Sequence, residues 1–214
     1  GAKPENIREY PFSSFYQAEI LPDVVPQSEK LEIRQKLGIG EAKMLLAIGQ
    51  FIPRKGFDVL LKAAAQLDKT VGIYFVGGEA TPEYTALRET LGLTNVHFVG
   101  FKPKAELAEY YKAADAFALP TREDIWGLVI NEAMAYGLPV VTTDRCVAGV
   151  ELVENGVNGY IVPVEDEAAL AGRLRELLSS DMPAMGRISL EKIRNYTLEN
   201  MAKAHMDYLQ ECGK

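Results

Sequence analysis

Two acidic side chains, Asp124 and Glu132, carry the strongest chemical signal in this sequence of 214 residues. Asp124 lies with Glu123 in an acidic turn that follows an apolar run ending at Pro120, and Glu132 lies inside the helix-forming segment that comes next. On a continuous helix their spacing places the two side chains about 80° apart around the axis, so we expect both carboxylates to border one cleft. Carboxylates accept paired hydrogen bonds from vicinal hydroxyls, as a ribose or a hexose presents. The alternatives are an N-cap role for Asp124 and an exposed helix position for Glu132.

A second candidate group is basic and lies between Gly49 and Gly56. Arg54 and Lys55 stand directly before the apolar pattern of a helix. Two cations beside a helix N-terminus suit a phosphate, because the side chains and the helix dipole have the same sign. The segment matches neither the Walker loop nor the G-x-G-x-x-G pattern, which argues against a dinucleotide cofactor. The alternative is that both cations are solvated surface charges.

Two further loops, 77–81 and 100–104, also follow apolar runs. Phe101 could stack on a nucleotide base while the backbone of residues 100–102 reads its edge, or it could lie in the core. Loop 77–81 is expected to be a simple turn. The two histidines, His97 and His205, are expected to be structural. The sequence contains no Ser-His-Asp set, H-E-x-x-H motif or Cys/His cluster, so neither a hydrolase nor a metal centre is predicted.

The elements that must position these groups alternate between strands and helices. Compact apolar runs predict strands at 44–48, 71–76, 96–99, 116–119, 138–142 and 160–162. Helical patterns occupy 29–37, 57–67, 82–91, 107–114, 127–136 and 170–178, and two more helices are expected after residue 181. This alternation predicts an α/β, Rossmann-like fold with a doubly wound parallel sheet of about six strands. Because such sheets bind ligands outside the carboxyl ends of their strands, the candidate loops should face one ligand.

Composition and charge narrow the class of protein. Charged residues make up 25% of the chain, hydrophobic residues 48%, and the net charge is −7, which is ordinary for a globular domain and argues against nucleic-acid binding. Cys146 and Cys212 are expected to be reduced thiols, and no apolar run could span a bilayer. We therefore expect a cytoplasmic protein with an irregular N-terminal segment (1–39), one Rossmann-like domain (40–180) and C-terminal helices (181–214).

Residues 40–180 resemble the C-terminal, donor-binding domain of a retaining GT-B glycosyltransferase of family 4. The resemblance rests on the order and spacing of GQFIPRKGFDVLLKAA, VHFVGF, YYKAADAFALPTREDIWGLVINEAMAYGLPVV and NGVNGYIVP. When the family's E-x7-E pattern is aligned on 127–129, Asp124 replaces the first glutamate and Glu132 is the second. Glu123 lies one residue too early, but it could take the first role if the turn is remodelled. Gln50 stands where the family commonly has arginine, and Arg54 is expected to compensate.

The resemblance implies a role for each residue. Lys55 and Arg54 would neutralise the diphosphate of a nucleotide-sugar, Glu132 would hold the ribose hydroxyls, and Asp124 would contact the transferred sugar. Neither a metal nor a cofactor would be needed, because the cations and the helix dipole stabilise the departing nucleoside diphosphate. Lys55, Asp124 and Glu132 are the predicted catalytic residues. The predicted donor contacts are Gly49, Gln50, Arg54, Lys55, Gly100, Phe101, Lys102, Glu123, Asp124, Gly127, Leu128, Val129 and Glu132.

The implied reaction is transfer of a hexosyl group from a UDP- or GDP-linked donor to a hydroxyl, with retention, in glycan or polysaccharide synthesis. Enzymes of this family have two Rossmann-like domains, and this chain has room for one. A glycan or lipid-linked acceptor would be bound mainly by a domain preceding residue 1, so we expect weak donor binding and no turnover by this chain alone. Peripheral membrane association is compatible with such an acceptor but is not encoded here. The alternatives are a non-catalytic nucleotide-sugar-binding module and a GT-B-type nucleotide-sugar epimerase.

Overall fold

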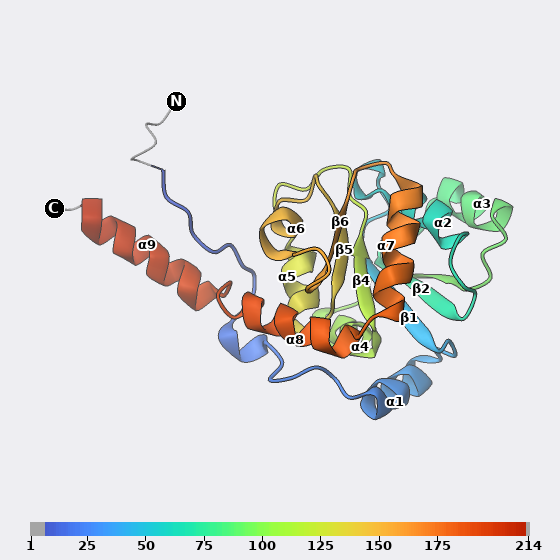
Figure 1. Cartoon of the computed structure of the whole chain (residues 1–214), viewed down its shortest axis with the longest axis horizontal. Helices are drawn as coiled ribbons and strands as arrows, with labels where there is room; N and C mark the ends of the chain where they lie inside the picture. The colour runs from blue at the N-terminus through green and yellow to red at the C-terminus, as the bar shows by residue number, and fades with distance from the viewer. Residues whose placement is uncertain (1–6, 213–214) are drawn as a thin grey trace.

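The computed structural model of the chain describes residues 7–212, and a six-stranded sheet lies at its centre (Figure 1). The strand order is β3-β2-β1-β4-β5-β6, and every neighbouring pair is parallel. The strands are β1 Lys43–Gly49, β2 Val71–Gly77, β3 Val96–Val99, β4 Ala116–Leu119, β5 Val140–Thr143 and β6 Gly159–Val162. The predicted doubly wound α/β fold is confirmed.

Helices cover both faces of this sheet. One face packs against α2, α3 and α7, the other against α1, α4, α5 and α6, and α8 contributes side chains to both hydrophobic clusters. The helices are α1 Gln27–Leu37, α2 Phe57–Ala64, α3 Pro82–Thr90, α4 Lys104–Ala113, α5 Leu128–Ala135, α6 Val147–Leu152, α7 Glu167–Ser179, α8 Met182–Ile193 and α9 Leu198–Cys212, with short 3₁₀ turns η2 Gln17–Glu19 and η3 Pro53–Lys55.

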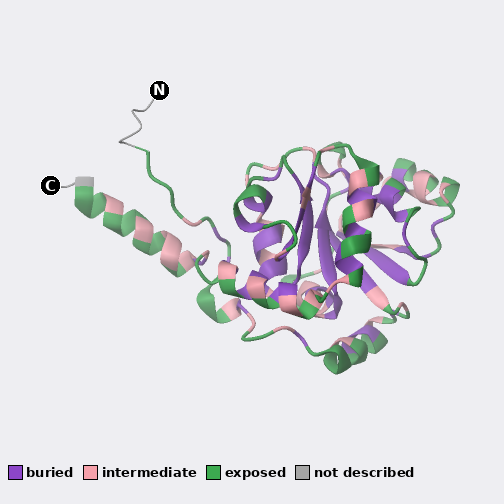
Figure 2. Cartoon of the chain, viewed as in Figure 1, coloured by how far each residue is buried: buried purple, intermediate pink, exposed green. Residues whose placement is uncertain are grey.

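The apolar runs that predicted the strands are buried on both sides, as Figure 2 shows for the central strands. Along β1, Met44, Leu46 and Ile48 belong to one hydrophobic cluster, whereas Leu45 and Ala47 belong to the other. Side chains of a strand alternate between its two faces, so a strand covered by helices on both faces must be apolar throughout. Burial on both faces therefore explains why these strands appear as continuous runs rather than as alternating patterns.

Three local details differ from the sequence-based expectations. Helix α6 was not predicted, because it has only six residues and contains Gly149. Strand β5 begins at Val140 rather than at residue 138, since Pro139 has no N–H to donate to the sheet. Leu67 was expected on a helix face, but α2 ends at Ala64 and Leu67 is buried just beyond it.

The strand order creates a switch point between β1 and β4. From β1 the chain builds outward through β2 to β3 and then returns to place β4 on the other side of β1. The loops that follow β1 and β4 therefore leave the same edge of the sheet in opposite directions. Open α/β sheets bind ligands in the crevice that forms at such a point.

The two ends of the described chain leave the body together (Figure 1). Residues 7–12 run beside α9, where the Tyr10 and His205 rings lie 4.5 Å apart and Tyr208 donates a hydrogen bond to the Glu9 carbonyl. Residues 1–6 and 213–214 of the predicted terminal segments lie outside the described part of the chain. Among the described helices, none is long and apolar enough to cross a membrane.

Candidate functional site

The loops that follow β1 and β4 are joined by hydrogen bonds across the switch point. The backbone N–H of Arg122 donates to the Arg54 carbonyl at 2.7 Å, and the Arg54 guanidinium donates to the Glu123 carbonyl at 3.0 Å. The Thr121 hydroxyl lies 2.9 Å from both of these carbonyl oxygens. Segments almost seventy positions apart in the sequence therefore form one unit at the carboxyl edge of the sheet.

Gly56 lies where these loops approach most closely. Its φ is +65°, and a Cβ at this position would lie 1.9 Å from the Pro120 carbonyl oxygen. An L-residue is disfavoured in this conformation, and the obstacle is backbone, which cannot rotate away. The glycine that the sequence places after Lys55 is thus required by the contact between the loops.

Lys55 and Asp124 form an ion pair inside this unit. The Lys55 ammonium donates to the Asp124 carboxylate at 2.6 Å, and each side chain is 14% exposed. The Arg54 guanidinium lies 3.5 Å from the same carboxylate oxygen. Glu123 is exposed and contributes its carbonyl to the loop contacts. Three of the predicted site residues therefore lie together, and Asp124 rather than Glu123 faces the lysine.

Helix α5 begins directly beside this pair. Its N-cap is Gly127, with φ +100°, so the alternative in which Asp124 caps this helix is wrong. A Cβ at Gly127 would lie 2.6 Å from the Cys146 sulfur, which explains the glycine. The backbone N–H groups of Leu128 and Val129 belong to the first turn, where a helix leaves its donors without intrahelical acceptors. This end of α5 therefore offers positive character next to Lys55.

Glu132 lies farther along α5 in a different environment. The Tyr111 hydroxyl donates to its carboxylate at 2.7 Å, and the Tyr111 ring is stacked on Tyr136 with centroids 5.0 Å apart. Burial raises the pKa of Glu132 above its usual value, although the hydrogen bond from Tyr111 and the charge of Lys104 act in the opposite direction. The alternative that Glu132 is an exposed helix residue is wrong.

Glu132 lines a cavity of about 370 Å³ that also contains two residues of the loop after β3, Phe101 and Lys102. Phe101 is 77% exposed, so the alternative that placed it in the core is wrong. Gly100 lies next to the Glu79 carboxylate of the loop after β2. The remaining lining residues are Ser14, Phe15, Glu19, Lys104, Leu107, Ala108, Tyr111, Ala135 and Tyr136.

The two predicted carboxylates do not share this cavity. Neither Lys55 nor Asp124 is among the residues that line it, so the expectation that Asp124 and Glu132 border one cleft is not confirmed there. The two groups are linked instead through α5, which runs from Gly127 beside the ion pair to Glu132 in the cavity. Five residues of helix correspond to about 7.5 Å along the axis.

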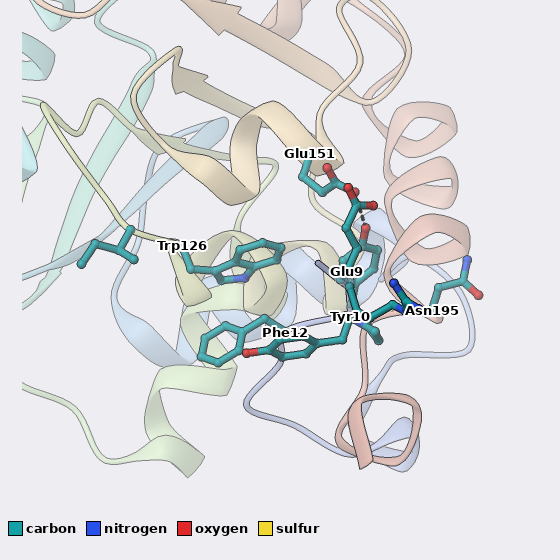
Figure 3. Close-up of a pocket in the computed structure, with 10 residues that line it drawn as sticks. Glu9, Tyr10, Phe12, Trp126, Glu151 and Asn195 are labelled. Carbon is teal, nitrogen blue, oxygen red and sulfur yellow. Dashed lines mark hydrogen bonds between the residues drawn. The ribbon is translucent and has the colours of Figure 1, made fainter. Parts of the chain in front are cut away.

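A larger cavity of about 670 Å³ is lined in part by the loop after β4 (Figure 3). Figure 3 shows Trp126 beside Phe12, whose ring centroid lies 5.8 Å from that of the indole. The indole N–H of Trp126 donates to Asn131 at 2.9 Å. Ile125 and Trp126 line the cavity together with residues 8–12, Glu151, Asn195 and Tyr196. Its walls thus come largely from segments that the Lys55 and Glu132 groups do not use.

Sequence reasoning missed several residues of the Lys55 and Glu132 groups. Tyr111 was placed on an apolar helix face, although its hydroxyl binds Glu132. Phe15 and Glu19 line the Glu132 cavity from a segment expected to be irregular. Arg122 was not singled out, although a cation at the start of the acidic turn, directly after Pro120 and Thr121, was a usable signal.

The other candidate groups have ordinary surroundings. His97 lies 2.6 Å from the Glu41 carboxylate and is stacked on Tyr74, which fits a structural role. Cys146 is a buried free thiol, and the Cys212 side chain lies outside the described part of the structure. Within the described residues, no group of three or more His, Cys, Asp or Glu side chains is arranged to hold a metal ion.

Comparison with known proteins gives consistent matches. The model of the family described as "Glycosyl transferases group 1" matches residues 29–200. A D-inositol 3-phosphate glycosyltransferase from Corynebacterium urealyticum is 36% identical over 186 residues, which cover 79% of this chain and 43% of that protein. The chain thus spans less than half the length of this relative.

Solved structures agree on the fold. Sucrose-phosphate synthase from Thermosynechococcus elongatus superposes with a TM-score of 0.80 at 24% identity, covering 96% of this chain and 53% of that chain. HepE from Anabaena, in complex with UDP and glucose, gives a TM-score of 0.79 at 24% identity and covers 95% and 56%.

Proposed function

This chain belongs to the glycosyl transferases group 1 family, and from that premise we propose that it is the donor-binding part of a glycosyltransferase. The proposed reaction is transfer of a hexosyl group from a nucleoside-diphosphate sugar to an acceptor hydroxyl, with retention of anomeric configuration, as in family 4. The observation that carries the proposal is that a paired cation, Lys55, lies in the loops at the topological switch point of the sheet, while a buried carboxylate, Glu132, lies on the helix that follows one of these loops.

The diphosphate would lie against Lys55, Arg54 and the first turn of α5. Before the donor binds, the Lys55 ammonium is neutralised by Asp124 at 2.6 Å. An arriving diphosphate would compete with Asp124 for this ammonium, and it would also accept hydrogen bonds from the backbone N–H groups of Leu128 and Val129. The three sources of positive character then stabilise the negative charge that develops on the leaving nucleoside diphosphate, so the proposal requires no metal ion.

The nucleoside would occupy the cavity that contains Glu132. Its carboxylate is held by Tyr111 through one oxygen at 2.7 Å, and a carboxylate has further acceptor positions for the two ribose hydroxyls. Phe101 lies at the same cavity and is 77% exposed, which suits stacking on a base. The distance of about 7.5 Å along α5 between Gly127 and Glu132 is of the order that separates a diphosphate from a ribose ring.

Asp124 would contact the hydroxyls of the transferred sugar once Lys55 has turned to the diphosphate. An aspartate is one methylene shorter than the glutamate of the family pattern, so the sugar would have to lie closer to the loop. The acceptor and the rest of the active site would come from parts of a longer protein, because this chain covers 43% of its Corynebacterium relative. We therefore expect the chain alone to bind donors without turning them over.

Calorimetric titration of the chain with UDP and UDP-glucose tests the proposal. The unmodified chain should bind UDP. Lys55→Ala should lower the affinity for UDP by about 10- to 100-fold, because hydrogen bonds to charged groups contribute about 1.5–3 kcal/mol. Glu132→Ala should lower the affinities for UDP and for uridine by similar factors. Lys36→Ala on α1 and Glu191→Ala on α8, both exposed, are the controls. Absence of affinity for any nucleoside diphosphate would refute the proposal. An isomerised nucleotide-sugar in the product mixture of a complete protein would favour an epimerase instead.

A further inference from the structure

We infer that Arg122 is a positioning residue for the diphosphate site, one that holds the loop carrying Arg54 and Lys55 against the loop carrying Asp124. The inference rests on the proposed function, since it names the group that keeps the proposed phosphate-binding cations in place. Arg122 was not a predicted site residue, and it lines a cavity distinct from that of Glu132.

The guanidinium of Arg122 forms a two-pronged ion pair with Asp58 in the first turn of α2. One terminal nitrogen donates to Oδ1 at 2.9 Å and the other to Oδ2 at 2.8 Å. The planar fork of arginine matches both oxygens of a carboxylate at once, which a lysine ammonium cannot do. This pair ties the loop after β4 to the helix that directly follows Lys55.

The same guanidinium reaches two more segments. It donates to the carbonyl of Pro53, at the start of η3, and to Glu165 in the loop between β6 and α7, with one contact at 3.1 Å. Glu165 adopts φ +62°, a left-handed conformation that is uncommon outside glycine. One side chain thus joins the loops that follow β1, β4 and β6.

The backbone of Arg122 completes the connection to the predicted phosphate cations. Its N–H donates to the Arg54 carbonyl at 2.7 Å. The side chain of Arg122 therefore holds Pro53, and its main chain holds the next residue, Arg54. Lys55 follows directly and lies 2.6 Å from Asp124. A displacement of the Arg122 side chain would therefore remove the contacts that flank Lys55, at Pro53 and Asp58, and loosen the segment that presents the Lys55 ammonium.

The charges around this site support a positioning role over a purely stabilising one. Arg122 and Asp58 are 28% and 29% exposed, so water partly screens their attraction and the pair adds less to global stability than a fully buried ion pair of the same geometry. Burial alone would raise the pKa of Asp58, but the hydrogen bond and charge of Arg122 outweigh it and hold that pKa below its usual value. The pair is therefore ionised and structured at neutral pH while contributing modestly to folding.

The test compares the affinities of each variant for UDP and for uridine, which differ only by the diphosphate. Arg122→Met should weaken UDP binding by about tenfold or more and uridine binding by less than twofold, with a melting temperature close to that of the unmodified chain. Arg122→Lys should restore only part of the UDP affinity, since it keeps the charge and loses the fork. Arg175→Met, an exposed arginine on α7, should change neither affinity.

Should Arg122→Met fail to fold, Asp58→Asn weakens the same fork and leaves the Glu165 and Pro53 contacts, and it should reduce UDP affinity selectively. Equal losses for UDP and uridine, or unchanged UDP affinity, would overturn the inference and leave the proposed function standing. Failure of the unmodified chain to bind UDP would instead remove the proposed function together with this inference.

Discussion

The Lys55 group lies in the loops before α5 and the Glu132 group lies on that helix, and the two groups are built in opposite ways. Around Lys55, opposite charges are paired across two loops, and the backbones of the two loops also approach each other closely. Around Glu132, a buried carboxylate is held by a phenol, in a cavity that Glu19, Lys102 and Lys104 also line. One region is ordered by interlocking loops and compensated charge, and the other by the packing of helices α4 and α5.

The contrast shows how one scaffold can prepare two kinds of ligand contact. Charge compensation keeps the Lys55 ammonium in position until an anion replaces Asp124 as its partner. Burial of Glu132 raises its pKa, so protonation of this carboxylate should make ligand binding in the second region depend on pH. Changes in the first region should therefore alter loop geometry and affinity for phosphate, whereas changes in the second should alter the pH dependence of nucleoside binding.

The largest effect is expected from Gly56→Ala, which attacks the interlocked loops. The added Cβ would lie 1.9 Å from the Pro120 carbonyl at φ +65°, and we expect a loss of about 2–4 kcal/mol of unfolding free energy together with loss of UDP binding. Gly172→Ala is the matched control, because this helical glycine of α7 has nothing within 4 Å of the new Cβ, and it should stabilise by about 0.5–1 kcal/mol. Thermal unfolding of both variants measures the difference, and equal melting temperatures would contradict the proposed contact.

The next effect concerns pH and the buried carboxylate. If ionised Glu132 accepts the ribose hydroxyls, the affinity for UDP-glucose should fall as the pH is lowered through its raised pKa, and Glu132→Gln should bind more weakly with little pH dependence. Stability should change in the opposite direction. A carboxyl whose pKa is raised in the folded state binds more protons in that state than in the unfolded chain. Its contribution to the unfolding free energy is therefore present below the unfolded-state pKa and is lost as the pH rises through the folded-state pKa.

Titrations at several pH values, with Glu191→Gln on α8 as control, separate these two trends. UDP-glucose is the suitable ligand, since a diphosphate esterified at both ends has no ionisation of its own near these pH values. A pH profile that is the same in the unmodified chain and in Glu132→Gln would show that this carboxylate does not contact the nucleoside.

Tyr111→Phe should have a smaller effect in the same region. It removes the 2.7 Å hydrogen bond to Glu132 and leaves the carboxylate buried with one donor fewer, at a cost of about 1–2 kcal/mol in unfolding free energy. Because that bond lowers the pKa of Glu132, its loss should move the pH midpoint of UDP-glucose binding upward. Tyr110→Phe, a neighbouring buried tyrosine on α4, serves as control. An unshifted midpoint would mean that Tyr111 does not act on the carboxylate.

The smallest change expected is a gain in affinity from Gln50→Arg. Gln50 is exposed in the loop after β1, at the position where the family commonly has arginine. A third cation near the diphosphate, beside Lys55 and Arg54, should tighten UDP binding by about 3- to 10-fold at low salt and less at high salt. Uridine affinity should stay unchanged. A gain that is equal for UDP and uridine would argue that the residue contacts something other than the phosphates.

Features that depend on residues close together in the sequence could be predicted, whereas contacts between distant segments could not. Buried strands and amphipathic helices are visible as local patterns, and the sheet and its flanking helices are confirmed. Arg54, Lys55 and Asp124 were selected from residue type and from their place after apolar runs, and they do lie together. Their roles in binding a donor stay predictions.

Local pattern failed where a contact depends on distant segments. The expected angle between Asp124 and Glu132 applies to one continuous helix, but α5 begins only at Leu128. Asp124 therefore belongs to the loop, where it forms an ion pair with Lys55. Helix α6 was missed because six residues are too few for a periodic signal. Tyr111 looked like one more apolar helix residue, because nothing near it in the sequence shows that a carboxylate comes to lie against its hydroxyl.

The amino-acid sequence thus determined which segments are buried, which loops carry acidic and basic residues, and which family the motifs resemble. The sequence did not show which loops contact one another, because these contacts depend on the order of the strands in the sheet. Once β4 pairs with β1, Arg122 lies against Asp58 and Lys55 lies against Asp124. Contacts between segments almost seventy positions apart arise from chain packing as a whole, and no window of neighbouring residues contains them.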